Sequence, residues 1–574
     1  MAVWGPRLVA PPSWIPDFYV SPTGGTGGGS IADPWSFPYA IGTGAGTAQG
    51  DGKLPTTGAK VALRGGNYAH TDTTYTVAAG GVLGSGIDAQ DGKLQFRAYR
   101  ASAYALPEVP SFIRTSSGNP PTSGDNIFVT GNYVWFWDID ASFVVSTRVP
   151  SSEPSGFCIS AYQSAPVGLK VINSRIHDGA GGIFLDSRDP AGNIFDGGEV
   201  YGTIFYNQGW AMGDGGGHHI YSHHKGSLYR RNIQACIFGP DEANGVQHYS
   251  VAGIYGWEQN FDHLDNIHFN SGTLNNINGL GAITGAGSHV VLGGNTSANG
   301  HMNNINCKRC YFYWPDAYGD NHIQIGQGGV DQIGANVIVD GHYGRGGGKG
   351  YGVIRIPSIL AAGGTLSFQS NAFRAEPSSG STNGRLLRMA ESGGAGYTIT
   401  LNSWFRALGG GGLDCGPDGA EPQAFADTTS LCRTRAQWES DCGFSGNTLT
   451  QADPTATVAF NVPANKYEPA RSHVTYFNWA SLARIPVDLS ATMPFGASFR
   501  VDDWRDTSGA SPITVYDAPS GGNPVSAFTG ALVYFPTSQL SDPVMVGSNW
   551  GVGVETAPPA TAPFHNTFLV RRTG

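Results

Sequence analysis

Apolar and polar residues alternate over short stretches along the chain, and each stretch ends in a turn. Six such stretches recur between residues 169 and 340, each with an aliphatic residue beside Asn or Gly: LKVINSRIHDG, VYGTIFYNQGW, SLYRRNIQACIFG, LDNIHFNSG, MNNINCKRCYFYW and ANVIVDGHYG. Their reference positions lie 29 to 38 residues apart and are Ile172, Ile204, Ile233, Ile267, Ile305 and Val337. Alternation with a period of two predicts strands, and a repeat of this length without helical stretches predicts coils that stack on one another.

The stacked strands should form a β-solenoid in which each coil buries its face only against its neighbours. Inward aliphatic side chains fill the interior of such a coil, while alternate residues face solvent along a continuous sheet. We therefore expect Ile172, Ile204, Ile233 and Ile267 to stack inward in adjacent coils. Loops of variable length would project from one side, and the resulting long groove suits a linear polymer.

Composition supports a strand-rich chain. Glycine supplies 85 of the 574 residues, and charged residues make up only 13%, too few for long solvated helices. The formal net charge of −10 disfavours binding to a nucleic acid, and an anionic polymer would need a local basic patch. No apolar run reaches about 18 residues, and MAVWGPRLVAPPSWIPDFYV lacks the layout of a secretory signal, so we expect no membrane insertion.

The N-terminal part carries motifs in a fixed order: FYVSPTGGTGGG (18–29), DPWSFPYAIG (33–42), KVALRGGNYAH (60–70), KLQFRAYR (93–100) and NIFVTGNYVWFWDID (126–140). This order resembles the opening of right-handed parallel β-helix proteins of the pectate-lyase-like class, in which a capping strand precedes the first coils. The resemblance covers roughly residues 16–360 and implies a fold more than a reaction.

Beyond residue 360 the repeat fades. From NVPANKYEPARSHVTYFNW (461–479) onward, short alternating strands recur with Gly/Pro turns, and this part resembles the small β-sandwich that follows β-helices in bacterial glycan-associated proteins. The predicted fold class is thus all-β, a right-handed parallel β-helix followed by a small C-terminal β-sandwich. The expected parts are an N-terminal arm (1–17), the β-helix (18–360), an irregular connecting region (361–462) and the β-sandwich module (463–574).

The stretch GDGGGHHIYSHHKG (213–226) holds four of the 15 histidines within seven positions. If Ile220 faces the core, alternation sends His219, Tyr221 and His223 outward, with His218 at their edge. The next coil, NGVQHYS, could stack beside this histidine strip. A polysaccharide lyase needs a Tyr, His or Lys base and a cation or amide for the developing enolate. The candidate catalytic residues are His219, Tyr221, His218, His223 and His248.

Charged and aromatic residues around the strip are candidates for substrate binding: Asp214, Lys225, Arg230, Asp241, Glu242, Tyr249 and Trp257. Hydrolysis would instead need two carboxylates roughly 5–10 Å apart. Asp214, Asp241, Glu242, Glu258 and Asp262 are available, but no spacing singles out a pair. Asp138 and Asp140 in WFWDID, on one strand face, could also serve.

The family resemblance also bears on the strip. Similar β-helix proteins carry GHGIY at the matching place, so Gly217, His218, Ile220 and Tyr221 align while His219 replaces a glycine. The alternative to a catalytic role is a polar outer face with hydrogen-bonded histidines.

No metal or other cofactor is expected. Cys307 and Cys310 form a CxxC, but no second CxxC or C/H pair lies at zinc-finger spacing, and NCKRCYFYW is typical of a strand. Metal binding by the histidine strip would need ligands that converge from at least two coils.

Two functions fit these features. The first is a tailspike-like virion protein, a homotrimer that binds, and if enzymatic cleaves, a cell-surface polysaccharide of the capsule or lipopolysaccharide type. It is favoured by the start at Met1 without an export signal and by a Pro-rich arm that could dock on other virion proteins. The second is a secreted, extracellular bacterial polysaccharide lyase or glycoside hydrolase, which the C-terminal resemblance favours.

Overall fold

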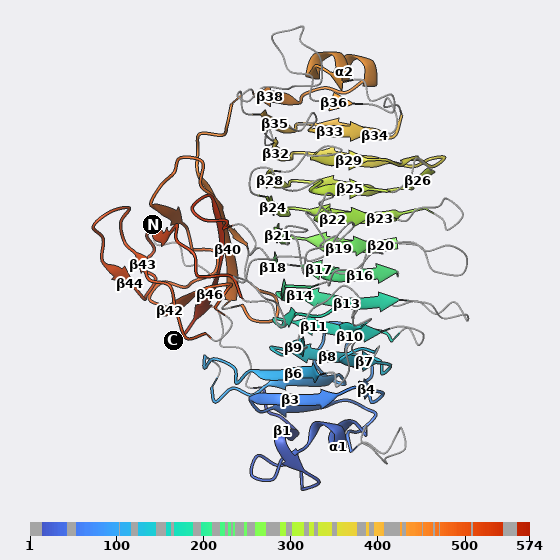
Figure 1. Ribbon diagram of the computed structural model, residues 1–574, viewed down its shortest axis with the longest axis vertical. Coiled ribbons are helices and arrows are strands. Elements are labelled where there is room, and N and C mark those ends of the chain that lie inside the picture. The colour runs from blue at the N-terminus through green and yellow to red at the C-terminus, as the bar shows by residue number, and fades with distance from the viewer. Residues whose placement is uncertain are drawn as a thin grey trace, which may run out of the picture.

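The strands stack into a long column with a second, smaller body at its side (Figure 1). This computed structural model describes residues 14–574 apart from 43–52, 103, 116–123, 145–155, 162–165, 187–196, 209–217, 224–227, 231–232, 236–245, 249–258, 271–287, 294–300, 315–320, 327–330, 347–352, 376–385, 390–394, 407–424, 427–431, 451, 463–464, 470, 507–508 and 544–559. Among the described residues no helix is long and apolar enough to cross a bilayer.

The column is the predicted parallel β-helix, and each full coil adds one strand to each of three sheets, A, B and C in turn. Sheet A consists of β1 (Phe18–Gly25), β2 (Ala59–Leu63), β5 (Leu94–Ala98), β8 (Val134–Trp137), β11 (Lys170–Ile172), β14 (Glu199–Tyr201), β17 (Leu228–Arg230), β20 (Gln259–Leu264), β23 (Asn303–Lys308), β27 (Val337–Asp340), β31 (Leu366–Gln369) and β34 (Tyr397–Thr400). Sheet B consists of β3 (Gly66–Thr71), β6 (Pro110–Thr115), β9 (Asp140–Val144), β12 (Arg175–His177), β15 (Ile204–Tyr206), β18 (Ile233–Ala235), β21 (Ile267–Phe269), β24 (Tyr311–Tyr313), β28 (Tyr343–Arg345), β32 (Ala372–Ala375), β35 (Ser403–Arg406) and β38 (Thr448–Thr450). Sheet C consists of β4 (Tyr75–Val77), β7 (Ile127–Val129), β10 (Phe157–Ala161), β13 (Gly181–Asp186), β16 (Ile220–His223), β19 (Val246–His248), β22 (Val290–Leu292), β25 (Ile323–Ile325), β29 (Ile354–Ile356), β33 (Leu387–Met389), β36 (Phe425–Ala426) and β37 (Cys432–Arg433).

Short aliphatic strands stack in register to fill the interior. In sheet C, Ile159, Ile183 and Ile220 pair across three successive coils and are fully buried. Such residues lose nearly all contact with water only because the next coil covers them, so burial of apolar area stabilises neighbouring coils together.

The corner between sheets A and B has a repeated backbone geometry. One residue, such as Asn173 (φ 53°) or Asp265 (φ 57°), adopts the left-handed conformation, and Asn, Asp and Gly tolerate it best. The next residue points inward and links the coils: the side-chain oxygen of Asn447 accepts a hydrogen bond from Asn402 (2.8 Å), and that of Asn402 accepts one from Asn371 (3.0 Å). Each corner needs a left-handed residue, and many need an inward side chain that links coils by hydrogen bonds, which explains why Asn and Gly recur between the strands of the repeat.

Two short helices close the ends of the column (Figure 1). In α1 (Phe37–Ile41) the Phe37 ring contacts the ring of Phe112 edge-on at 4.8 Å. In α2 (Arg435–Cys442) a capping box of Thr434 and Gln437 fixes the first turn, and Trp438 is buried. These caps protect strand edges that would otherwise pair with another chain.

The C-terminal part is a module of two antiparallel four-stranded sheets, as predicted for a β-sandwich. One sheet has β39 (Val458–Val462), β40 (Arg471–Phe477), β46 (His565–Arg572) and β42 (Phe499–Asp503); the other has β41 (Arg484–Val487), β45 (Val533–Pro536), β43 (Val515–Tyr516) and β44 (Pro524–Val525). A separate pair, β26 (Asp331–Ile333) and β30 (Ile359–Leu360), extends from the column.

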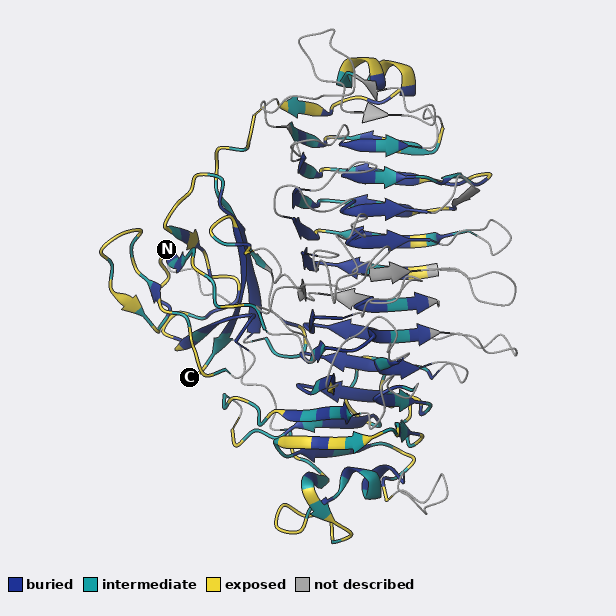
Figure 2. Ribbon diagram, viewed as in Figure 1, coloured by how far each residue is buried: buried dark blue, intermediate teal, exposed yellow. Residues whose placement is uncertain are grey.

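The C-terminal module packs against the outer face of sheet B. Its Phe477, Trp504 and Leu569 form one buried cluster with Ile204 and Ile267 of the column. Figure 2 shows β40 buried where it faces the middle coils. In these middle coils, one face of sheet B therefore lines the interior, and the other is covered by the module.

This docking corrects the expected orientation of the isoleucines. Ile204, Ile233 and Ile267 do pair in adjacent coils of sheet B, but Ile204 and Ile267 face the module rather than the interior. Ile172 lies in sheet A and contacts Trp135 and Trp137 on its outer side. Alternation could not show which side is interior because both faces of sheet B are apolar.

The parallel ladder also continues past residue 360, the expected end of the β-helix. Strands of all three sheets follow, and sheet B ends at Thr450. The inward positions there mix Asn371, Asn402, Phe373 and Trp404 with aliphatic residues such as Leu366 and Ile399, so the repeat is harder to see in the sequence. The division of the chain into four parts at the expected boundaries otherwise stays a prediction.

Candidate functional site

The histidine strip begins at the corner before β16, in the middle of sheet C. Ile220 faces the interior as expected, in register with Ile183 and Val246. The next residue, Tyr221, lies on the outer side and is partly exposed. The strip therefore does present a tyrosine on the surface of the column.

His219 does not face outward, and that expectation is wrong. Its side chain is fully buried and stacks on the ring of Phe205, with ring centroids 5.4 Å apart. It occupies the corner before a sheet C strand, where His289 and His322 are also buried and their Nδ1 atoms lie 3.0 Å apart. Because this corner residue points inward, the strict alternation expected for a strand does not extend to it.

A sequence signal for this interior row exists. HHIYS (218–222), SHVVL (288–292) and NHIQI (321–325) each place a histidine directly before an aliphatic residue that opens a strand. A histidine in this motif indicates a core position rather than a catalytic one.

Four rings stack face to face on the outer side of sheet C. The Tyr221 ring lies 5.4 Å from Phe184 and 4.9 Å from His218, and Phe184 lies 4.8 Å from Phe157. The two phenylalanines and Tyr221 are partly exposed, whereas His218 is buried. We name Phe157, Phe184, Tyr221 and His218 the outer aromatic stack.

Gly181 makes room for this stack. A Cβ atom at Gly181 would lie 2.2 Å from Cε1 of Phe157, so only glycine allows that ring to lie flat there. Sequence reasoning missed both phenylalanines. The shared pattern of IFLD (183–186) and IYSH (220–223) could have indicated the partnership of Phe184 and Tyr221.

The remaining catalytic candidates are placed by strand register. His223 ends β16 opposite Asp186. His248 pairs with Ser222 rather than with Tyr221, whose partner in β19 is Gln247. The outer row of Tyr221 therefore does not pass through position 248, contrary to the expected extension of the strip.

The substrate-binding candidates are less closely grouped in the described structure. Arg230 ends β17 in sheet A, opposite Tyr201 and Leu264, and so lies on a different sheet from the strip. The other candidates lie outside the described residues: Asp214, Lys225, Asp241, Glu242, Tyr249 and Trp257.

Asp138 and Asp140 do not share a strand face. Asp138 occupies the corner between sheets A and B, with φ 56°, and forms an ion pair with Arg100 at 2.7 Å. Asp140 accepts a hydrogen bond from His177 Nε2 at 3.0 Å, and Asp178 accepts one from Nδ1 at 2.7 Å. Each carboxylate thus has a basic partner, which makes the two a poor pair for glycoside hydrolysis.

His177 is held as an imidazolium. Burial alone would lower its pKa, but Asp140 and Asp178 outweigh that effect and raise the pKa of His177 to about 10. A histidine that stays protonated at neutral pH cannot serve as a general base.

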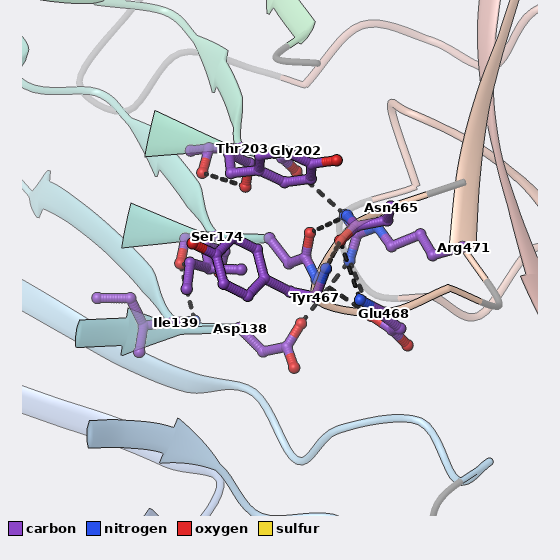
Figure 3. Close-up of polar contacts among 12 residues, drawn as sticks. Asp138, Ile139, Ser174, Gly202, Thr203, Asn465, Tyr467, Glu468 and Arg471 are labelled. Carbon is purple, nitrogen blue, oxygen red and sulfur yellow. Dashed lines mark hydrogen bonds and ion pairs between the residues drawn. The ribbon is translucent and has the colours of Figure 1, made fainter. Parts of the chain in front are cut away.

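A charged junction joins the column to the module (Figure 3). Glu468 accepts from Arg100 at 2.8 Å, Asn465 donates to Asn173 at 2.7 Å, and Arg471 lies 3.7 Å from Asp138. Burial raises the pKa of Glu468, but the arginines outweigh it and hold that pKa at about 2. The adjoining cavity measures about 70 Å³, far below the ~300 Å³ at which ligand sites begin, so this junction is a structural contact.

No protein-family model matches the chain, and no curated protein matches its sequence. Among solved structures, pectate lyase Pel9A is 15% identical, with 73% of this chain and 89% of that chain covered and a TM-score of 0.41. DFA-IIIase from Arthrobacter chlorophenolicus A6 is 12% identical, with 77% and 100% covered and a TM-score of 0.41.

A third similar structure is the enzymatically active domain of bacteriophage CBA120 tailspike protein 2. It is 10% identical, with 80% of this chain and 59% of that chain covered and a TM-score of 0.32.

Proposed function

We propose that this chain is a tailspike-like polysaccharide-binding protein and that its glycan contacts the outer face of sheet C. The outer aromatic stack carries the proposal. Three partly exposed rings from three successive coils lie nearly parallel, with interplanar angles of 16° and 20° between neighbours. Flat aromatic faces offer apolar area against which the C–H faces of sugar rings pack.

The other faces of the column are less open in the part of the chain that is described. The C-terminal module covers the outer face of sheet B in its middle coils. Tyr467 covers Trp135, Trp137 and Ile172 on sheet A. Sheet C has no such contact among these clusters, which favours it as the ligand face.

The same row of sheet C carries positive charge further along the column. From Tyr221 the register runs through Gln247, Val291 and Gln324 to Arg355 and then to a second arginine at 388. Both arginines are partly exposed, whereas Val291 and Gln324 are buried. The row therefore offers an aromatic patch and a basic patch about 19 Å apart, four coil spacings.

This pairing favours an acidic polysaccharide of the capsule or lipopolysaccharide type. Guanidinium groups bind carboxylates and phosphates through paired N–H donors. Because the chain as a whole has a net charge of −10, a local basic patch is what an anionic polymer needs. A glycan long enough to contact the aromatic patch and the basic patch at the same time would gain affinity from both contacts.

The test is binding of the purified full chain to acidic and neutral capsule fractions, measured by calorimetry. Tyr221→Ala should weaken binding about 5-fold, since stacking on one ring contributes about 1 kcal/mol. Arg355→Ala with Arg388→Ala should weaken binding to the acidic glycan only. Tyr534→Ala, a partly exposed tyrosine of the module, is the matched control and should bind normally. Unchanged binding by Tyr221→Ala would contradict the proposal.

Cleavage is measured in the same samples. Unsaturated sugars, seen by ultraviolet absorbance, would identify a lyase with Tyr221 as the proposed base, and new reducing ends without them a hydrolase. Presence of the protein in purified phage particles supports the virion role, and recovery from a bacterial culture medium supports a secreted enzyme instead.

A further inference from the structure

The interior of the column contains a compact group of metal-binding side chains. His263 lies in β20, His268 in β21, Cys307 in β23 and Cys310 at the corner before β24. All four side chains are fully buried. None of them belongs to the outer aromatic stack.

Coil stacking brings the four residues together. His263 and Cys307 are register partners in adjacent strands of sheet A. Arg309, with φ 52°, turns the chain into sheet B and brings the next residue, Cys310, inward. His268 follows the equivalent corner one coil earlier, beside Phe312. Two residues from each of two successive coils thus face one point.

Three of the four ligand atoms lie close together, and the fourth lies beside one of them. Nε2 of His263 lies 3.1 Å from Nε2 of His268, and Sγ of Cys310 lies within 4.8 Å of a ring nitrogen of each histidine. Sγ of Cys307 lies within 4.8 Å of Sγ of Cys310 but not of all three atoms of that group. Around a zinc ion with bonds of 2.0–2.3 Å, neighbouring ligand atoms are about 3.3–3.8 Å apart, so Cys307 must move toward the two histidines to complete the site.

We propose that His263, His268, Cys307 and Cys310 bind one zinc ion inside the β-helix. Two thiolates and two imidazoles are the ligand set that zinc prefers in structural sites, and two thiolates balance its charge in an apolar interior. All four ligands are protein side chains without access for substrate, so the ion would join two coils rather than take part in chemistry.

The neighbouring His342 has one ring nitrogen already in use. It lies close to both cysteines, and its Nδ1 accepts the backbone N–H of Cys310 at 3.0 Å, so only its Nε2 could reach a metal. That bond orients the corner carrying Cys310. His342 also continues the ladder of corner asparagines formed by Asn371, Asn402 and Asn447, since its backbone N–H donates to the Asn371 side chain at 2.8 Å.

The competing explanation is a hydrogen-bonded cluster without metal. The two imidazoles could share one proton across the 3.1 Å contact, and the Cys310 thiol lies 3.6 Å from the carbonyl oxygens of His263 and Lys308. Metal content separates the two.

The sequence did not predict this site because the two pairs lie on different coils. The spacing from His268 to Cys307 is 39 residues, well outside zinc-finger loops of about 12–15 residues. In a solenoid, one coil takes the place of that loop.

The test is elemental analysis of the full chain produced in zinc-containing medium and purified without chelators. We expect about one zinc per chain, and less than about a tenth of that in Cys310→Ser. Cys158→Ser is the matched control, because Cys158 is also a buried thiol of the interior; it should keep the metal. Equal zinc in Cys310→Ser and the parent would overturn the proposal.

A second measurement needs no variant and so does not depend on how Cys310→Ser folds. The chain produced with cobalt in place of zinc should show thiolate-to-cobalt charge-transfer bands and the strong visible bands of a tetrahedral site. A wild-type chain that binds neither ion overturns the proposal, and the cluster is then hydrogen-bonded only.

Discussion

At the scale of single residues, the environment of each titratable group decides its role. His177 and His219 both lie within the column, yet one is clamped between two carboxylates and the other stacks on Phe205 in the core. Neither arrangement suits a general base. Of the five predicted catalytic residues, Tyr221 is the one that the described structure shows partly exposed on the outer face.

The clamp on His177 predicts a pH dependence of stability. Its pKa rises from 6.5 to about 10 on folding, so the stabilisation is fully present below pH 6.5 and is lost as the pH rises toward 10. Urea unfolding of the wild type should show a free energy of unfolding that falls over this interval. In His177→Gln the fall should be smaller, and equal slopes for both proteins would refute the assignment.

At the scale of elements, the corner between sheets A and B determines how coils stack. Asn371, Asn402 and Asn447 repeat a side-chain contact from coil to coil, and Asn402 also donates to the Phe368 carbonyl at 2.9 Å. Each buried amide satisfies backbone groups that would otherwise lack partners at a turn. The ladder thus stabilises corners where few apolar contacts are possible.

Asn402→Ala tests this ladder. It removes four hydrogen bonds, two accepted from Asn371 and one donated to each of Asn447 and Phe368. Because buried partners are left unsatisfied, we expect a loss of about 2–4 kcal/mol in the free energy of unfolding. Asn67→Ala, an exposed position in β3, is the control and should change stability by less than about 0.5 kcal/mol. Similar values for both variants would show that the ladder contributes little.

The elements were largely predictable, and their orientation was not. Short period-two strands and turn-forming Asn and Gly indicated a stacked parallel fold, because those features are local. Which side of a strand faces inward depends on the coils and the module beside it, so Ile204 and His219 were misplaced. The partnership of Phe157 and Phe184 depends on register between coils, which the local pattern does not contain.

At the scale of the whole molecule, the chain is one long column with a module docked on its side (Figure 1). The fold class was predicted from the order of N-terminal motifs and from the C-terminal strand pattern. The metal-ligand cluster was not predicted, because it is formed only when two coils stack. Both outcomes follow from the same property of solenoids, in which neighbours in space are one coil apart in sequence.

Self-association is a prediction at this scale. The helices α1 and α2 close the ends of the column, so association between copies should be lateral, and we expect a homotrimer. Light scattering should give a mass about three times that of the 60.2 kDa chain. A mass near that of one chain would show that the protein acts as a monomer.

The docking of the module has a mechanical consequence. In a bare solenoid each coil touches only its neighbours, so a pull along the axis would peel coils from an end one after another. Here the module contacts the column from Arg100 in an early coil to Arg374 in a later one. Because the module holds these coils to one another, they should unfold together under force, and the middle of the column should withstand a larger force than its ends.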